Sequence, residues 1–360
     1  MRTLILSLMW IVATNGCNKN DKAPKQDPGI TTTVLADNLN QPWEILWAPD
    51  NSIWFTERSG NIKKIDPATK VVTSILSISD VVSNGEGGLL GMAMHPDFNN
   101  LPFVYIAYNY DASNGYKEKI VRYQYNGTTL NNPMILLNNI DAAGIHNGCR
   151  LLIYNNKLFI TTGDAASDTR AQNTTSLNGK VLRINLDGTI PDDNPIPGNP
   201  LWSYGHRNAQ GLVVVNDIMY ISEHGPSTDD EINIITKGKN YGWPNVRGFC
   251  NEQSEQTFCA ANNVIEPIKA WTPTIAVCGL DFYNSDLIPQ WKNSLLLCTL
   301  KGSRLLQLKL SDANTITETN EFFADEFGRL RDVCIAPDGK VYVCTGNGAN
   351  NDKIIEITKK

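Results

Sequence analysis

The feature that most constrains the fold of this chain is a strand–turn–strand unit that recurs six times. In each copy, short runs rich in β-branched, aliphatic and aromatic residues flank a turn that usually contains Pro, Asp or Asn. The six copies begin at Leu46, Met92, Arg150, Gly211, Ser294 and Val333. Repeats of about 40–60 residues are typical of radial architectures, in which the sheets form a ring and leave few long edges free.

Most of the six units close with a further strand in which apolar residues alternate with polar ones. These closing segments are residues 62–65, 120–123, 181–184, 232–235, 305–308 and 354–357. Helical periodicity is nearly absent, so we predict an all-β fold. The specific expectation is a six-bladed β-propeller of four-stranded antiparallel blades over residues 31–360, with its longest insertion at 243–281.

The N-terminal sequence predicts an export signal. A basic start at Arg2 precedes an apolar stretch at residues 4–13 and the junction Gly16-Cys17. This junction resembles the lipobox of bacterial lipoproteins, which predicts a lipoprotein-type signal peptide over residues 1–17 ending at the lipid-anchored Cys17. Residues 18–30 are expected to form a flexible polar tether. An ordinary cleaved signal is the alternative, and both interpretations place the protein in the periplasm or cell envelope.

Composition excludes several classes of protein. The hydrophobic share of 41% is ample for a packed core, which excludes a wholly disordered chain. The net charge of −6 argues against a general nucleic-acid binder. Of the eight cysteines, seven follow Cys17. Cys334 and Cys344 could face each other across a hairpin, and Cys250 and Cys259 could close a polar loop. The sequence establishes neither pairing.

Polar residues gather where the blade pattern is interrupted. His95 lies in an ordinary turn and is expected to be structural. The other interruptions hold three histidines and four basic residues, namely His146, His206, His224, Arg207, Lys301, Arg329 and Arg331. If the loops converge at one mouth of the channel, the basic residues would form an anion site. The acidic run at 229–231 offers oxygen ligands suited to calcium, although solvated loop carboxylates would give the same pattern.

With these motifs together, the chain resembles the soluble glucose/aldose sugar dehydrogenase family, which uses pyrroloquinoline quinone (PQQ). The resemblance covers nearly the whole chain after the tether and is stronger for the shorter aldose branch. The segments that carry it are residues 88–91, 95–98, 179–188, 205–208, 210–211, 223–225, 230–233 and 240–245. It implies oxidation of aldose sugars at the anomeric carbon to lactones, with hydride transfer to a calcium-bound quinone.

The resemblance also implies roles for single residues. His146 matches the catalytic base, and Arg207 with Asn208 matches the pair at the reactive quinone carbonyl. The further positions that match cofactor contacts are Glu86, Trp271, Lys301, Arg329 and Arg331. The positions that match calcium sites are Gly225 and Pro226 for an ion shared with the cofactor, and Glu231 and Tyr241 for a structural ion. The expected partners are an aldose substrate and an electron acceptor that the sequence does not identify.

The chain departs from the glucose-oxidising members at several positions. Glu86 replaces Gln, Ile145 replaces Asp, Cys149 replaces Gly and His224 replaces Gln. The long insertions associated with dimerisation are largely missing, so a monomer is expected. Two alternatives to a dehydrogenase stay open at this point. One is a calcium-dependent lactonase on a similar propeller, and the other is a non-catalytic propeller that binds glycans or proteins.

Overall fold

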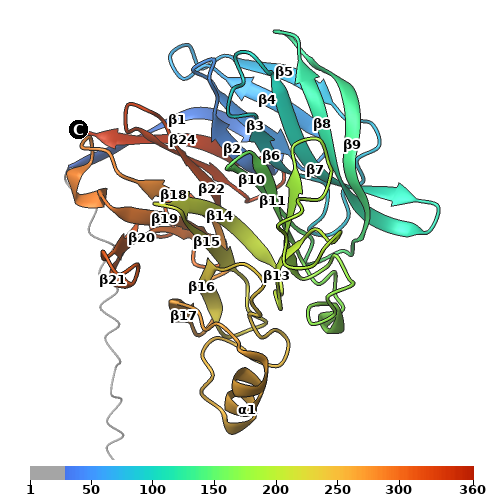
Figure 1. The fold of residues 1–360 in the computed structure, drawn as a ribbon. Helices are drawn as coiled ribbons and strands as arrows, with labels where there is room; N and C mark the ends of the chain where they lie inside the picture. The colour runs from blue at the N-terminus through green and yellow to red at the C-terminus, as the bar shows by residue number, and fades with distance from the viewer. Residues whose placement is uncertain (1–28) are drawn as a thin grey trace, which may run out of the picture.

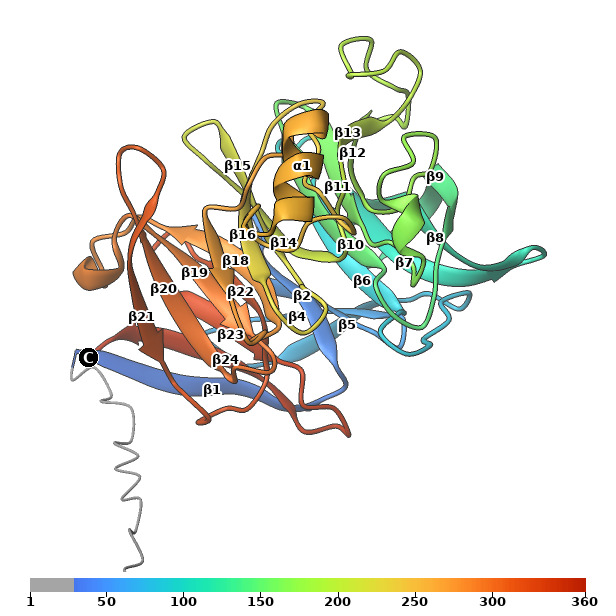
Figure 2. The same cartoon turned by 90° about the horizontal axis from the view of Figure 1, so that it is seen from below.

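The structure is a computed structural model that describes residues 29–360. Its strands form six four-stranded antiparallel sheets arranged around one axis, which confirms the predicted six-bladed propeller (Figures 1 and 2). The predicted signal peptide at 1–17, its Cys17 and nearly all of the expected tether lie outside the described residues. Across residues 29–360, none of the helices has the length and apolar character needed to cross a membrane.

The blades follow one another in chain order. The first contains β2 (Pro42–Trp47), β3 (Ile53–Glu57), β4 (Asn61–Ile65) and β5 (Val72–Ser77). The second contains β6 (Leu89–Met94), β7 (Phe103–Ala112), β8 (Gly115–Tyr125) and β9 (Leu130–Asp141). The third contains β10 (Gly148–Tyr154), β11 (Lys157–Thr162), β12 (Lys180–Asn185) and β13 (Leu201–Tyr204).

The remaining blades keep this plan. The fourth contains β14 (Ala209–Val215), β15 (Ile218–Glu223), β16 (Asp230–Ile235) and β17 (Lys269–Trp271). The fifth contains β18 (Val277–Tyr283), β19 (Ser294–Thr299), β20 (Arg304–Leu310) and β21 (Ile316–Phe322). The sixth contains β22 (Leu330–Ile335), β23 (Val341–Thr345), β24 (Asp352–Lys359) and β1 (Ile30–Leu39). Single turns of 3₁₀ helix occur at Asp168–Arg170 and Pro289–Trp291.

The ring is closed by pairing the two ends of the described chain. Strand β1 runs antiparallel to β24, with Val34 opposite Ile355, and supplies the outer strand of the last blade. Figure 1 shows β1 and the C-terminal strand side by side. With this closure the sixth blade has four strands, as the other five blades have. The last sheet therefore ends on β1 and the edge of β24 is paired.

The inner strands of the six blades share a local distortion. In β2, β6, β10, β14, β18 and β22, the register against the neighbouring strand shifts near the first residues. Such bulges re-aim side chains and increase strand twist. The strands are close enough here that a Cβ on Gly91 would lie 2.0 Å from the carbonyl oxygen of Cys149. The bulges therefore define one level of the channel at which side chains from different blades meet.

The hydrophobic core lies between neighbouring blades. Trp54 is fully buried between the first two blades and packs edge-on against Tyr125, with ring centroids 4.9 Å apart. Between the last two blades, the buried Trp291 packs in the same way against Phe322 at 5.0 Å. Because each blade buries both faces of its inner strands, the sequences of these strands are nearly continuous runs of apolar residues.

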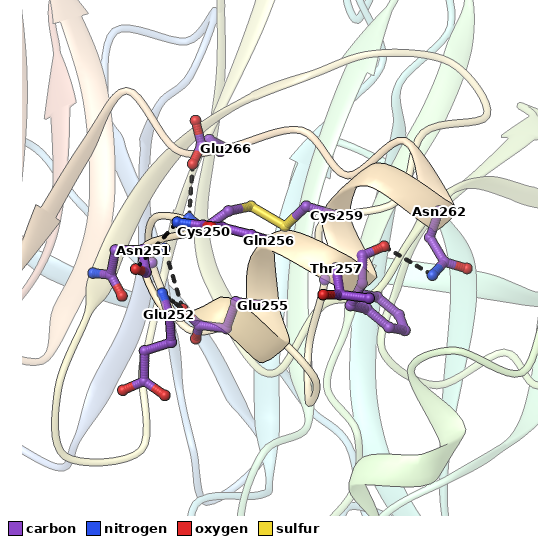
Figure 3. Close-up of a disulfide and its surroundings, with 12 residues drawn as sticks. Cys250, Asn251, Glu252, Glu255, Gln256, Thr257, Cys259, Asn262 and Glu266 are labelled. Atoms are coloured by element: carbon purple, nitrogen blue, oxygen red, sulfur yellow. Dashed lines mark hydrogen bonds between the residues drawn. A yellow bond between two sulfur atoms is a disulfide. The ribbon is translucent and has the colours of Figure 1, made fainter.

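The predicted insertion contains the helix α1 (Gln253–Asn262) and a disulfide between Cys250 and Cys259 (Figure 3). This confirms one of the two cysteine pairings suggested by the sequence. The backbone N–H of Cys250 donates to Glu266 Oε1 at 2.7 Å. The disulfide ties the segment before α1 to the helix itself, and the hydrogen bond ties it to the segment after the helix. Helix α1 projects from the fourth blade beyond β17 (Figure 1). The expected insertion at 243–281 was too long, because β17 and the start of β18 lie within it.

The other suggested pairing is wrong. Cys334 and Cys344 are buried free thiols. The register pairs Cys334 with Tyr342 and Cys344 with Asp332, so the two cysteines are not opposite each other on the hairpin. Adjacent strands place only directly opposed residues close enough for a short cross-link.

The closing strand gives a test of the ring. Leu35 is 6% exposed and packs in the core, whereas its neighbour Val34 is 39% exposed. We expect Leu35→Ala to lower the free energy of unfolding by about 2–5 kcal/mol, because it leaves a cavity at the closure. Val34→Ala, the matched control, should cost less than about 1 kcal/mol. Equal effects of the two variants in denaturant unfolding would contradict this closure.

Candidate functional site

A cavity of about 410 Å³ lies at the mouth of the channel where the inner strands begin. Its wall is polar, and the residues that define its character are Trp43, Arg58, Glu86, His224, Arg329 and Arg331. These residues come from four blades and the loops between them. The volume lies within the range of small-molecule sites, which makes this cavity the candidate functional site. We call it the cofactor cavity below.

Three guanidinium groups converge on the cofactor cavity. Burial, together with the charge of Arg331, lowers the pKa of both Arg58 and Arg329. Arg331 Nη1 donates to Gln210 Oε1 at 3.1 Å, which fixes its position at the level of the bulges. Like charges held together in a partly buried site create a strong preference for an anion. Arg329 and Arg331 were predicted site residues, whereas Arg58 was missed by the sequence analysis.

Glu86 adds one carboxylate to this cationic wall. Its Oε2 accepts a hydrogen bond from the backbone N–H of His146 at 3.0 Å. Its charge also raises the pKa of Arg58, Arg207 and Arg329 against the effect of their burial. Glu86 is thus balanced by three guanidinium groups, and it positions the backbone of the His146 loop.

His146 does not itself line the cofactor cavity, although the next residue, Asn147, does, and the His146 side chain forms a pair with Asp164. The side chain of His146 is 13% exposed, and its Nδ1 lies 2.8 Å from Asp164 Oδ1. The indole N–H of Trp243 donates to the other oxygen of Asp164 at 2.9 Å. If Nδ1 carries the proton shared with Asp164, Nε2 is the free acceptor. Asp164 was missed by the sequence analysis, although a carboxylate two residues after β11 could have drawn attention to it.

Arg207 and Asn208 are held by a single carboxylate. Glu223 Oε1 accepts hydrogen bonds from the backbone N–H groups of both residues, and Oε2 lies 2.9 Å from His206 Nδ1. Two side-chain donors, Arg207 Nε and Asn208 Nδ2, are buried without a hydrogen-bond partner among residues 29–360. Buried donors are nearly always satisfied, so a ligand or water is expected to accept from them. Arg207 lines a smaller pocket beside the cofactor cavity.

That smaller pocket, which we call the acidic corner, brings together all four predicted calcium positions. Gly225, Pro226, Glu231 and Tyr241 line it together with Glu223. Burial and the charge of Glu223 raise the pKa of Glu231 to about 8. In the part of the chain described here, no three His, Cys, Asp or Glu side chains are grouped as a metal site. A cation at this corner would therefore take backbone carbonyls among its ligands.

Lys301 and Trp271 do not line the cofactor cavity. Lys301 Nζ lies 3.4 Å from Thr274 Oγ1, two residues before Ala276 of the cavity wall. Trp271 lies in β17, with the ammonium of Lys269 5.8 Å from its ring. His224 lines both the cofactor cavity and the acidic corner. Burial and the charges of Arg331 and Arg207 lower its pKa to about 3, so its imidazole is neutral at physiological pH.

An ion-pair network, the channel floor, lies beneath the cofactor cavity. Arg150 Nη1 lies 2.6 Å from Glu44 Oε1 and 2.8 Å from Asp332 Oδ2. The guanidinium stacks 4.3 Å from the ring of Trp43, which lines the cavity above it. All three charged side chains are buried, and they come from the first, third and sixth blades.

Comparison with known proteins adds independent evidence. Residues 39–355 match the family model described as Glucose / Sorbosone dehydrogenase. The chain is 32% identical to quinoprotein glucose dehydrogenase B of Acinetobacter calcoaceticus, over 89% of this chain and 86% of that protein. It is 32% identical to aldose sugar dehydrogenase YliI of Escherichia coli (strain K12), over 88% and 90%. The PQQ-bound aldose sugar dehydrogenase of Streptomyces coelicolor superimposes with a TM-score of 0.80 at 29% identity, covering 94% of this chain and 100% of that one.

The channel floor makes a prediction about stability. Arg150→Met should lower the free energy of unfolding by about 3–5 kcal/mol, because it leaves Glu44 and Asp332 buried without a cation. Adding Glu44→Gln and Asp332→Asn to that variant should restore much of the loss, since no buried charge then remains unpaired. Denaturant unfolding of the single and triple variants measures both effects. A triple variant less stable than Arg150→Met would contradict this account of the floor.

Proposed function

We propose that this chain, which belongs to the glucose/sorbosone dehydrogenase family as its motifs indicated, oxidises aldose sugars at the anomeric carbon to lactones with PQQ as cofactor. The observation that carries the proposal is the juxtaposition of two features at one mouth of the channel. Three arginines converge on a cavity of about 410 Å³, and its wall residue Glu86 accepts from the backbone N–H of His146, which pairs with Asp164. The first feature suits an anionic cofactor, and the second suits removal of a proton.

The residues of the cavity fit PQQ, a planar o-quinone that carries carboxylates. Arg329 and Arg331 offer guanidinium forks that match carboxylates in two-point contacts. Arg58 adds positive charge, while its Nε and Nη2 donate to the backbone carbonyls of Gly87 and Gly85. The donors Arg207 Nε and Asn208 Nδ2, which have no partner among the described residues, would donate to oxygen atoms of the ligand. When bound, PQQ supplies the electrophilic carbonyl that accepts the hydride of the anomeric carbon, a chemistry that no side chain provides.

His146 would act as the base. Oxidation at the anomeric carbon requires loss of the hydroxyl proton, and neutral imidazole at Nε2 can take it. Asp164 fixes the orientation of the ring through Nδ1 and would stabilise the imidazolium that forms. Arg207 carries a fixed positive charge beside the site, which would stabilise negative charge developing on an oxygen there.

We propose calcium for the acidic corner. Backbone carbonyls crowd Gly225 so closely that a Cβ there would lie 1.9 Å from the carbonyl oxygen of Thr228. The backbone carbonyls of Gly225 and Pro226, with the carboxylate of Glu231, would supply the hard oxygen donors that calcium prefers. The hydroxyl of Tyr241 already accepts from Thr236 N–H and donates to the Ile234 carbonyl, so this side chain contributes packing at the corner rather than a free hydroxyl ligand.

The N-terminal motif supports a further part of the proposal. The protein would be exported and anchored through lipidated Cys17, and it would act as a monomer that passes electrons to an acceptor in the periplasm or cell envelope. Cys17→Ala should shift the protein from the membrane fraction to the released fraction of its native host. Equal membrane retention of the variant would contradict the lipid anchor.

The assignment of the base can be tested by substitution. We expect His146→Gln to lower kcat by about 10²–10⁴-fold while PQQ binding persists, because only the proton acceptor is lost. Asp164→Asn should lower kcat less, since it disturbs the orientation of the ring. His95→Gln, in a turn of the second blade, is the matched control and should leave kcat unchanged. Sugar-dependent dye reduction at saturating PQQ measures all three. Turnover of His146→Gln near that of the natural protein would rule out this role.

The cofactor cavity makes a separate prediction about affinity. Arg331→Ala should raise the Kd for PQQ by about tenfold or more, because it removes a charged donor from the cavity wall. Lys301→Ala should raise it less, since the lysine does not line the cavity. Fluorescence titration of PQQ into each variant gives the two constants. An unchanged Kd in Arg331→Ala would contradict the placement of PQQ in this cavity.

A further inference from the structure

A second cavity of about 400 Å³ opens at the opposite end of the channel, where all six inner strands end. The channel floor separates the two cavities, so that Trp43 lines the first and the next residue, Glu44, lines the second. Nothing in the proposed sugar oxidation uses this space. The second cavity and the cofactor cavity have nearly the same volume, about 400 and 410 Å³. Both volumes lie within the range of small-molecule sites.

The walls of the second cavity combine apolar and polar groups. The apolar part includes Leu46, Trp47, Met94, Leu152, Ile153 and Val213. The ring of Trp47, which lines the cavity, stacks on Tyr342 with the ring centroids 5.8 Å apart. Thioether and indole groups suit an apolar ligand body, and an indole face also attracts a cation.

The charge inside the second cavity is unbalanced. Its lining includes three carboxylates, Glu44, Asp281 and Asp332, but Arg150 is the one basic residue among them. Arg150 pairs with Glu44 and Asp332, whereas Asp281 makes no ion pair within residues 29–360. Asp281 Oδ1 accepts a hydrogen bond from Phe282 N–H at 2.7 Å. Burial and the charge of Asp332 raise the pKa of Asp281 to about 7, as expected for a carboxylate without a cation.

One donor at this cavity has no hydrogen-bond acceptor. Arg150 is 3% exposed, and its Nη2 has no hydrogen-bond partner among the described residues. A buried guanidinium N–H is costly to leave unsatisfied, so a polar atom of a ligand or of water is expected beside it. The cavity therefore combines apolar side chains with a carboxylate that has no cation, Asp281, and a guanidinium N–H that has no acceptor, on Arg150.

We propose that the second cavity binds a small organic ammonium ion with an aromatic or branched aliphatic body. The ammonium group pairs with Asp281, and the body packs against Trp47, Met94 and Ile153. The site is independent of PQQ and of sugar oxidation. Failure of this proposal therefore leaves the proposed function unaffected, and failure of the proposed function leaves this one unaffected.

Calorimetric titration of the intact protein with 2-phenylethylammonium tests the proposal at about pH 8, where Asp281 is ionised and the amine is charged. The neutral isostere 2-phenylethanol is the matched ligand. We expect one amine per chain and at least about tenfold weaker binding of the alcohol. Asp281→Asn should weaken amine binding about tenfold. Asp286→Asn, which removes an exposed carboxylate nearby in the chain, should change nothing.

A second variant keeps the test independent of the charge change. Met94→Trp adds volume to the apolar wall and should reduce amine binding without removing a carboxylate. Arg331→Ala alters only the cofactor cavity and should leave amine binding intact. The proposal is overturned if the amine does not bind, if the alcohol binds equally well, or if both Asp281→Asn and Met94→Trp bind the amine as the natural protein does.

Discussion

One buried guanidinium, that of Arg150, joins three blades at the axis of the ring, and both cavities depend on it. A buried ion pair is a weak source of net stability because desolvation offsets the attraction between its charges. Its stronger effect is positional, since an unpaired Glu44 or Asp332 would be costly. Arg150 therefore holds β2, β10 and β22 at fixed separation and divides the channel into two chambers.

The bulges on the inner strands explain why the functional groups meet at this level. Each inner strand shifts register where it enters the channel, so side chains that would face a neighbouring blade turn toward the axis. Arg331 and Gln210 contact each other across the channel in this way, although 121 residues separate them in the chain. The loops that carry His146 and Arg207 are attached directly to these rigid strands, and their backbones are fixed by Glu86 and Glu223.

The sequence predicted the blades well because inner and middle strands are buried and follow regular patterns. The outer strand β5, mostly exposed, and the closing strand β1 carried no such pattern, and β1 pairs with a segment more than three hundred residues away. For the candidate site, motif resemblance predicted roles for His146 and Arg331. It did not identify Asp164 or Arg58, because their roles arise only when loops of different blades meet. The position of Cys334 relative to Cys344 could not be predicted either, because it depends on the register with which the two strands of the hairpin pair.

The central claim is that the cationic cavity and the His146–Asp164 pair form one sugar-oxidising site. The most direct measurement starts from protein stripped of metal and adds calcium and then PQQ. The reduction of a dye is then measured with each of a panel of aldoses. We expect reduction of the dye only when both an aldose and PQQ are present, with the corresponding lactone as product. PQQ binding without any aldose-dependent reduction, under conditions where a known sugar dehydrogenase is active, would contradict it.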